Sequence, residues 1–330
     1  MIRLDSIKIE VPEMAIKSMD RNMPCNTQTV NGVVTSECYT VPKSHLPFGV
    51  RSIQVRERDG ERTAIVETSA KILKDQYYEM INNNTIDRYL HELNKNGSVI
   101  FTSDLVDSAR LLTMDVTQNL QVGDKIASYV SAMACVPITD KYNVTAYKGS
   151  GNMGVVWAGK QKSFKERQIF YDKLKDIARD SKLRKAVHSK DLQRFKGVLR
   201  VEGNFTSFKK IREYTGSDNL LRDVLNSDQQ VNIKLFDKIT RNVNTVNLEL
   251  LMEWDGMKFY QIEKLEGRKS IIRAFDYDMV KIKSFIRERI SGNINGYVTA
   301  YRELCNAMRK ERGIPETNIL QEIRQYMLTA

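Results

Sequence analysis

The sequence predicts an α+β protein, with an antiparallel β-sheet core and flanking helices, followed by a mostly helical C-terminal region. Three observations carry this prediction. Several short segments in the first two thirds of the chain alternate apolar and polar residues, which is the pattern of a half-buried strand. Two of these segments flank Asp59-Gly60, a pair typical of a tight turn between antiparallel strands. From Leu220 onward the apolar residues recur at helical spacing instead.

The first part of the chain reads mainly as strands. Residues 1–10 predict a strand, whereas residues 18–48, rich in Asn, Pro, Thr and Ser, predict a long loop or an irregular hairpin. Residues 50–55 and 62–68 are the expected strands on either side of the turn. Ser69 is expected to cap a short helix that follows them.

The middle of the chain continues this mixture. Apolar side chains share one helical face at residues 85–95, which predicts a helix. Residues 111–117, 167–171 and 197–205 are β-branched, aromatic or apolar runs and predict further strands. Residues 126–133 fit a helix or a strand, and the pattern leaves this open.

The last third of the chain is predicted to be helical. Seven segments show helical spacing, at residues 221–225, 233–243, 246–254, 258–265, 277–290, 297–309 and 316–328. Because strand patterns stop before these segments, we place a domain boundary between residues 1–216 and 217–330.

Positive charge is concentrated between Lys160 and Arg212. This window holds 17 Lys or Arg and 6 Asp or Glu, an excess that equals the formal net charge of +11 of the whole chain. Such a concentration is the electrostatic footprint of a surface that binds a polyanion. The plainer interpretation is a solvated helix face, which many charged runs form.

Composition excludes several classes of protein. The chain has 330 residues, 41% of them hydrophobic, and no run of 18 apolar residues, so we expect a globular cytoplasmic protein that does not cross a membrane. Four cysteines form no CxxC pair, which favours reduced thiols. The three histidines are far apart in sequence, so we expect neither a His-ligated metal nor a Ser-His-Asp triad. Any metal would be held by carboxylates, which favours Mg²⁺ or Mn²⁺ over zinc.

Residues 149–154 read Gly-Ser-Gly-Asn-Met-Gly and match the pattern GxGxxG. That pattern binds a dinucleotide only where it follows a strand and opens a helix. Here the residues on both sides are strand-like, so we favour a hairpin loop over a cofactor site.

Tyr171, Asp115 and Glu202 are the candidates for chemistry. Tyr171 lies in the basic window, where Arg167 and Lys173 are cations that could favour its phenolate. The two acids lie in strand-like runs, and on paired strands they could share one face with a cation between them. The plainer alternatives are a core tyrosine and two solvated acids at strand edges.

Six short pieces of the chain, taken in order, carry a family resemblance. They are Ala-Lys-Ile-Leu at 70–73, Ser-Ala-Arg-Leu at 108–111, Asp-Val-Thr at 115–117, Phe-Tyr-Asp-Lys at 170–173, Leu-Arg-Val-Glu at 199–202 and Asp-Val-Leu at 223–225. In this order they resemble the replication initiators of filamentous phages and rolling-circle plasmids, especially those of Bacteroidetes-type phages and plasmids. The resemblance spans residues 65–245.

The resemblance implies a DNA-nicking site. Tyr171 would be the nucleophile that cuts one DNA strand, with Lys173 and Arg167 at the phosphate. Asp115 and Glu202 would hold a divalent metal, Mg²⁺ or Mn²⁺.

Two features depart from the family's usual pattern. Asp176 would be a further metal ligand, at a position where the family more often has Glu. The chain also lacks a His-hydrophobic-His pair, so it differs from the His-ligated initiators.

Further basic residues are expected to contact DNA through its phosphates. They are Lys160, Lys162, Lys165, Lys175, Arg184, Lys185 and Arg200.

The expected function is rolling-circle replication initiation in the cytoplasm of a bacterial host cell, with residues 1–216 as the nicking domain. The protein would recognise a single-stranded or hairpin origin in supercoiled DNA, form a 5′-phosphotyrosine and leave a free 3′-OH. A host helicase and polymerase are candidate partners, and a homodimer is left open. The alternative is a non-catalytic origin-recognition or copy-control protein, which would need the basic window but neither Tyr171 nor the acids.

Overall fold

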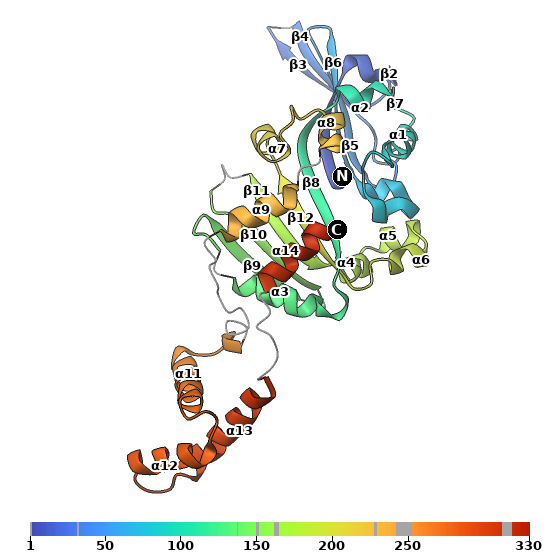
Figure 1. The fold of residues 1–330 in the computed structure, drawn as a ribbon. Helices are drawn as coiled ribbons and strands as arrows, with labels where there is room; N and C mark the ends of the chain where they lie inside the picture. Colours follow the sequence, from blue (N-terminus) through green and yellow to red (C-terminus); the bar gives the residue numbers. More distant parts are fainter. Residues whose placement is uncertain are drawn as a thin grey trace. The chain divides into compact units, whose positions relative to one another are not determined.

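The protein is described by a computed structural model that covers residues 2–31, 33–136, 138–149, 152–161, 165–227, 230–241, 253–311 and 319–330. Ten of the described strands form one antiparallel sheet in the order β3-β4-β5-β6-β1-β8-β12-β11-β10-β9, and β2 pairs with β7 separately (Figure 1). The strands are β1 (Leu4–Pro12), β2 (Ile16–Met19), β3 (Cys25–Val30), β4 (Val33–Thr40), β5 (Val50–Arg58), β6 (Glu61–Ser69), β7 (Val99–Phe101), β8 (Arg110–Gln121), β9 (Tyr142–Gly149), β10 (Asn152–Gly159), β11 (Glu166–Asp172) and β12 (Val198–Phe205). The predicted antiparallel core is therefore confirmed.

The hairpins follow the turn chemistry of the sequence. Asp59 and Gly60, between β5 and β6, have φ values of 53° and 83°, the left-handed backbone that suits an Asp-Gly turn. The GxGxxG stretch joins β9 and β10, which pair antiparallel, so the hairpin interpretation is confirmed. Residues 150 and 151 at its tip lie outside the described residues.

Residues 18–48 form strands where a loop was one of two expectations. β3 and β4 pair into a hairpin that continues the sheet beyond β5. All residues of β3 are exposed, so this strand has no buried apolar face and shows no alternation in sequence.

Helices and short 3₁₀ segments surround the sheet. They are η1 (Glu13–Ala15), η2 (Ala70–Glu79), η3 (Gly123–Lys125), α1 (Ile86–Asn94), α2 (Asp104–Ser108), α3 (Ile126–Cys135), α4 (Lys173–Arg179), α5 (Ser181–Ala186), α6 (Ser189–Gln193), α7 (Phe208–Thr215), α8 (Leu221–Asn226), α9 (Val231–Thr240), α11 (Phe259–Ala274), α12 (Met279–Arg289), α13 (Asn295–Glu311) and α14 (Ile319–Thr329). The ambiguous segment at 126–133 is thus helical. The predicted cap at Ser69 is wrong, because its hydroxyl donates to the carbonyl oxygen of Gly49 instead of capping η2.

The apolar core lies on one face of the sheet, beneath α3 and α9. Trp157 of β10 and Phe170 of β11 pack edge to face with ring centroids 4.7 Å apart, and Phe236 of α9 closes over both. The Trp157 indole N–H donates to the carbonyl oxygen of Met133 at 3.0 Å, which fixes α3 on the same face. Hydrophobic burial therefore orders this face, and on the opposite face polar groups lie among further buried apolar side chains of η2, α4 and α5, such as Ile72, Ile177 and Leu183.

The chain divides into two compact units. Unit 1 comprises Met1–Val246 and Ile323–Ala330, and unit 2 comprises Asn247–Glu322. Unit 2 has a core of its own, to which Ile272, Ile282 and Cys305 contribute. Unit 1 thus extends beyond residue 216, after which we placed the end of the nicking domain. That functional boundary stays a prediction. No described helix has the length and apolar character needed to cross a bilayer.

The last helix, α14, returns the chain to unit 1. Arg324 donates two parallel hydrogen bonds to the Asp237 carboxylate of α9, at 2.8 and 2.9 Å. Gln118 of β8 donates to the carbonyl oxygen of Met327 at 2.9 Å. Unit 2 is therefore an insertion between two helices that lie side by side on the sheet.

Removing residues 242–318 and joining α9 to α14 by a Gly/Ser linker should leave unit 1 folded. The Asp237–Arg324 pair holds the two helices together, so a short linker closes the gap at low entropic cost. We expect a soluble protein that unfolds in a single cooperative transition, followed by circular dichroism on heating. An aggregated or non-cooperative product would mean that unit 1 depends on the insertion.

Candidate active site

Three adjacent strands bring the predicted residues to the polar face of the sheet. On β12, Arg200, Glu202 and Asn204 project to the same side because they are two residues apart. Tyr171 of β11 is the cross-strand partner of Arg200, and Asp115 of β8 is the partner of Asn204. Cross-strand partners point to the same face, so Tyr171, Glu202 and Asp115 share one surface.

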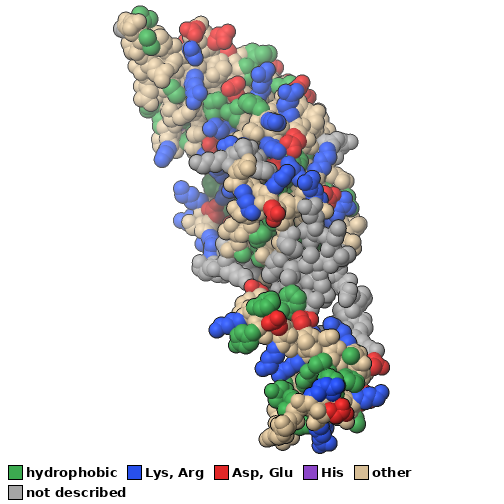
Figure 2. Space-filling view, turned by 90° about the vertical axis from the view of Figure 1, so that its left-hand side faces the viewer, with side chains coloured by type: hydrophobic (Ala, Val, Ile, Leu, Met, Phe, Trp, Pro, Cys, Tyr) green, Lys and Arg blue, Asp and Glu red, His purple; other side chains and the backbone are tan. Residues whose placement is uncertain are grey.

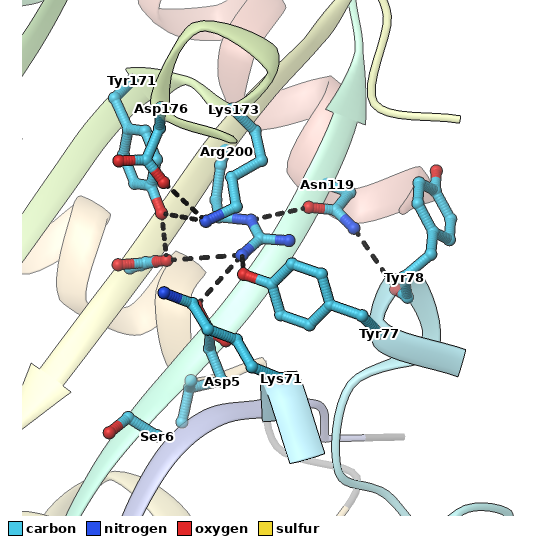
Figure 3. A network of polar contacts seen from close by, with 12 residues as sticks. Asp5, Ser6, Lys71, Tyr77, Tyr78, Asn119, Tyr171, Lys173, Asp176 and Arg200 are labelled. Carbon is cyan, nitrogen blue, oxygen red and sulfur yellow. Dashed lines mark hydrogen bonds and ion pairs between the residues drawn. The ribbon is translucent and has the colours of Figure 1, made fainter. Parts of the chain in front are cut away.

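Tyr171 is at the centre of a short chain of contacts. Its hydroxyl donates to Glu202 Oε1 at 2.6 Å, and Lys173 Nζ donates to the same hydroxyl oxygen at 3.3 Å (Figure 3). Lys173 also donates to Asp176 at 2.8 Å. Tyr171 is only 7% exposed. The structure therefore brings together four residues predicted from the sequence, which are Tyr171, Glu202, Lys173 and Asp176. They bind one another, and the Tyr171 side chain is almost fully covered.

Arg200 connects this chain of contacts to the rest of the sheet. None of its surface is exposed. Its guanidinium donates to Asp5 of β1 at 3.0 Å, to the Tyr77 hydroxyl of η2 at 3.2 Å and to Asn119 of β8 at 3.0 Å (Figure 3). It also lies 3.7 Å from Glu202. Arg200 Nη2 is buried and finds no hydrogen-bond partner within the described part of the chain, whereas its other two nitrogens hold Asp5, Tyr77 and Asn119. In this arrangement Arg200 positions its neighbours, and its predicted phosphate contact stays a prediction.

The Asp5 and Glu202 carboxyl groups lie against each other and share one negative charge. Burial, and next the charge of Asp5, raise the pKa of Glu202 to about 7, although Arg200 and Lys173 act in the opposite direction. Burial also opposes ionisation of Asp5, but Arg200 and Lys173 outweigh it and hold the Asp5 pKa below its usual value. Near neutral pH, Asp5 is ionised and Glu202 is poised to gain or lose a proton.

The Tyr171 phenol is held in its neutral form. Burial, and then the Glu202 charge, raise the pKa of Tyr171 well above 10, and Arg200 only partly offsets them. This is opposite to the expectation that nearby cations favour the phenolate. Lys173 stays charged: burial and Arg200 act to lower its pKa, but Tyr77, Asp5 and Asp176 raise it above the usual value.

Asp115 is on the same face but belongs to another contact. It accepts a hydrogen bond from the Asn204 amide, and burial raises its pKa to about 6. Asp176 is occupied by Lys173. Among the described residues, no three His, Cys, Asp or Glu side chains are placed to hold a metal together, so Asp115, Glu202 and Asp176 are not assembled as one ligand set.

The Asp5–Glu202 pair fits a divalent cation better than the predicted three acids do. Asp5 Oδ1 is buried and finds no hydrogen-bond donor within the described part of the chain. Two facing carboxyl groups need either a shared proton or a cation. Mg²⁺ is usually held by one or two carboxylates, with water and substrate phosphate completing its shell.

The other predicted basic residues separate into two places. Lys175, Arg184 and Lys185 are exposed on α4 and α5, near the end of β11 that carries Tyr171. Lys160 and Lys165 are exposed near the opposite end of β11, about 20 Å away by strand length.

Two predicted residues of the basic window need separate mention. Arg167 is exposed on β11, two positions before Ile169 and four before Tyr171, so it lies on the face of the candidate site. Lys162 lies outside the described residues. Figure 2 shows Lys and Arg side chains spread over one face of the molecule, with acidic side chains among them.

Comparison with known proteins adds little. The sequence matches no family model and no curated protein. One solved structure, a rolling circle replication initiator protein from Geobacillus stearothermophilus, is similar over 62% of this chain and 73% of that chain, with 12% identity and a TM-score of 0.28. At that TM-score the likeness carries no weight for the function of this chain.

Sequence reasoning missed Asp5, Tyr77 and Asn119. For Asp5 a signal existed: the apolar alternation of β1 slips by one residue at Asp5-Ser6, between Leu4 and Ile7. The structure has a register shift between β1 and β8 at that point, and such bulges turn an extra side chain toward a site. Tyr77 and Asn119 had no such signal, because their role depends on contacts with Arg200, distant in sequence.

The segment η2, which carries Tyr77, is strained. Inside it Lys74 has φ 52° and ψ −110°, and at its end Met80 has φ 61°. Positive φ is costly for residues other than glycine, by roughly 1–3 kcal/mol each. The Lys173 ammonium lies 5.5 Å from the Tyr77 ring and 5.3 Å from the Tyr171 ring, so η2 closes the site from above.

Glu202→Gln should remove a pH dependence of stability in the metal-free protein. Between the usual Glu pKa of 4.5 and the folded value of about 7, the folded protein keeps a proton that the unfolded chain releases. Stability is therefore lost as pH rises through this window, by about 3 kcal/mol for this group. Urea unfolding in EDTA at several pH values should show the wild type losing stability relative to the variant up to about pH 7. Parallel curves for the two proteins would contradict the shift.

Proposed function

We propose that this protein is a rolling-circle replication initiator that nicks one DNA strand with Tyr171. The observation that carries the proposal is the contact of the Tyr171 hydroxyl with Glu202 at 2.6 Å, beside the Lys173 ammonium at 3.3 Å. A phenol with a proton acceptor and a cation within reach is the arrangement that a tyrosine nucleophile needs. The order of sequence motifs supports the same function.

Glu202 is the proton acceptor in this proposal. Its pKa of about 7 is matched to taking up a proton near neutral pH. As the Tyr171 oxygen bonds to phosphorus, its proton passes to Glu202 and the bond from phosphorus to the 3′-oxygen breaks. The departing 3′-oxygen takes a proton from water. The products are a 5′-phosphotyrosine and a free 3′-OH, and the later attack of a 3′-OH on the phosphotyrosine restores the phosphodiester.

Lys173 and Arg200 support this step in different ways. Lys173 remains charged and stabilises negative charge that develops on the Tyr171 oxygen. Arg200 keeps Asp5 ionised and fixes the direction of its carboxylate. Asp176 holds Lys173 in place from the outer side.

A divalent cation, Mg²⁺ or Mn²⁺, would be held by the ionised Asp5, whose Oδ1 has no hydrogen-bond donor among the described residues, and Glu202 would stay free to accept the proton. When bound, it would offset negative charge on the scissile phosphate. Arg167, exposed on the same face, is available to a neighbouring phosphate, and the exposed cations of α4 and α5 extend that surface. The freed 3′-OH would prime a host polymerase.

The second candidate is a DNA-binding protein that does not cut. The burial of Tyr171 and its raised pKa favour this reading, because a structural tyrosine has both properties. The two candidates differ in whether a covalent protein–DNA product forms.

Tyr171→Phe should abolish nicking and leave DNA binding unchanged. The assay uses supercoiled plasmid that carries the protein's coding sequence with its flanking DNA, and Mn²⁺. Wild type should give open circles with protein attached to a 5′ end, and the variant should cut at least about a thousandfold more slowly because no nucleophile remains. The matched control is Tyr89→Phe, which removes another buried hydroxyl, bonded to Thr68, and should still cut. Cutting by the Tyr171 variant would assign the nucleophile elsewhere; a wild type that never cuts would favour the binding protein.

Asp5→Asn should weaken Mn²⁺ binding at least about tenfold, as measured by calorimetry. The reason is that Asp5 is the ionised member of the facing pair. Asp176→Asn is the matched control, because that carboxylate is paired with Lys173 and should leave the affinity unchanged. A larger loss in the Asp176 variant would restore the ligand set expected from sequence.

A further inference from the structure

The outer three strands β3, β4 and β5 present two parallel rows of polar side chains on one face. In the first row, Asn26 is paired with Cys38, and Cys38 with Arg56. In the second row, two residues further along each strand, the partners are Gln28, Ser36 and Arg58. Because cross-strand partners share a face, each row places an amide side chain and a guanidinium on the same surface.

This face is hollowed and carries no acid in the hollow. The hollow has a volume of about 750 Å³, and its lining includes Asn26, Gln28, Arg56 and Arg58. Within the part of the chain that the structure describes, Arg56 makes no ion pair, and the partner of Arg58 is the exposed Asp59 at 3.4 Å.

The acids of these strands are on the reverse face. There Glu37 and Glu57 are cross-strand partners and bind Arg21, with Glu57 at 2.9 Å. The hollow therefore presents Arg56 without an ion pair and Arg58 paired only with an exposed acid, whereas the acids of the reverse face are paired with Arg21.

The hollow and the candidate active site belong to the same face of the sheet. Arg56 of β5 is the cross-strand partner of Thr63 on β6. Ser69 lies six residues further along β6, so it points to the same face as Thr63, and its partner on β1 is Ser6. Ser6 is in turn the partner of Asp115. β4 and β12 are five strand spacings apart in the sheet, about 24 Å, and the six residues along β6 add about 20 Å in the strand direction. The two places are therefore about 30 Å apart, the length of about nine base pairs.

We propose that the face formed by β3, β4 and β5 reads the base edges of duplex DNA about nine base pairs from the nick. This rests on the proposed function for the position of the nick, but not for the binding itself. A two-stranded ribbon fits the major groove, where Arg recognises guanine and Asn or Gln recognises adenine through paired hydrogen bonds. The two rows offer one such amide and one such Arg each.

The tip of the hairpin fits the same partner. Val30, Val33 and Val34 are 57%, 65% and 53% exposed, which is unusual for three neighbouring valines. Figure 2 shows apolar side chains at the end of the molecule where Figure 1 has β3 and β4. Apolar contact with thymine methyl groups is a regular part of major-groove recognition.

The test measures duplex binding by fluorescence anisotropy in EDTA, so that no cleavage takes part. The probe is the duplex most enriched by wild type from a library of random-sequence duplexes. Arg56→Ala/Arg58→Ala should weaken its binding at least about tenfold, and Gln28→Ala, an exposed single change, should shift the preferred bases. The control Arg88→Ala/Arg222→Ala removes the same charge elsewhere on unit 1 and should retain the affinity and the preference. In wild type with Mn²⁺, the enriched motif should lie about nine base pairs from the cut.

Four outcomes would overturn the proposal. One is an affinity of the Arg56/Arg58 variant within about twofold of wild type, with melting curves showing that it is folded. Another is an equal loss in the control variant, which would reduce the effect to general charge. A third is an equal loss on the single strand of the same sequence. The last is found by analytical sedimentation: the wild type is a dimer, and the Arg56/Arg58 variant is a monomer with the same duplex affinity. That result would mean that the edge strand β3 pairs with a second copy of the chain.

Discussion

The neutralisation of one buried cation, Arg200, constrains the whole polar side of the sheet. A guanidinium cannot lose its proton in a protein, so removing it from water is costly unless carboxylates and hydrogen-bond acceptors surround it. Here the partners come from β1, β8 and η2, three segments far apart in the chain. The meeting of these segments thus depends on the charge on β12. Replacing Arg200 would leave the Asp5 carboxylate buried without its ion-pair partner. Arg200 therefore supports the site although its own side chain is not exposed to solvent.

The two faces of the sheet obey different physical rules. Around Trp157 and Phe170, apolar burial decides which side chains meet, and the exact partner matters less than volume. On the opposite face, directional hydrogen bonds hold Tyr171, Glu202 and Lys173. These groups are buried, where the effective dielectric constant is low and each polar group without a partner is costly. An arrangement of acids and cations with shifted pKa values of this kind is typical of sites that perform chemistry. The sheet makes both faces rigid, because each of its strands contributes side chains to both.

Sequence periodicity predicted the strands that have one buried face and failed for those that have none. β1 alternates, whereas β8, β11 and β12 are predicted from apolar, β-branched and aromatic runs, and their expected pairing does bring Tyr171 and Glu202 into contact. β3 is exposed on both sides, so no alternation marks it. The sequence predicted which types of residue form the candidate site, but not which side chains contact one another. Asp176 was expected beside the other acids and contacts Lys173 instead. Asp5 reaches the site because the register of β1 shifts at that point. Such contacts depend on tertiary register, which a single sequence does not encode locally.

The strained backbone of η2 has a consequence for access. A phosphodiester cannot reach the Tyr171 oxygen while Tyr77, Lys173 and Arg200 occupy the space around it, so a cutting enzyme would have to alternate between a shut and an open form. The twisted residue Lys74 and the twisted residue Met80 bracket the piece of chain that would swing. Energy held in those two torsions would be released on opening and would partly compensate for the contacts broken. In the shut form the Tyr171 hydroxyl would thereby stay shielded from solvent, and only a ligand that binds the open form more tightly would expose it.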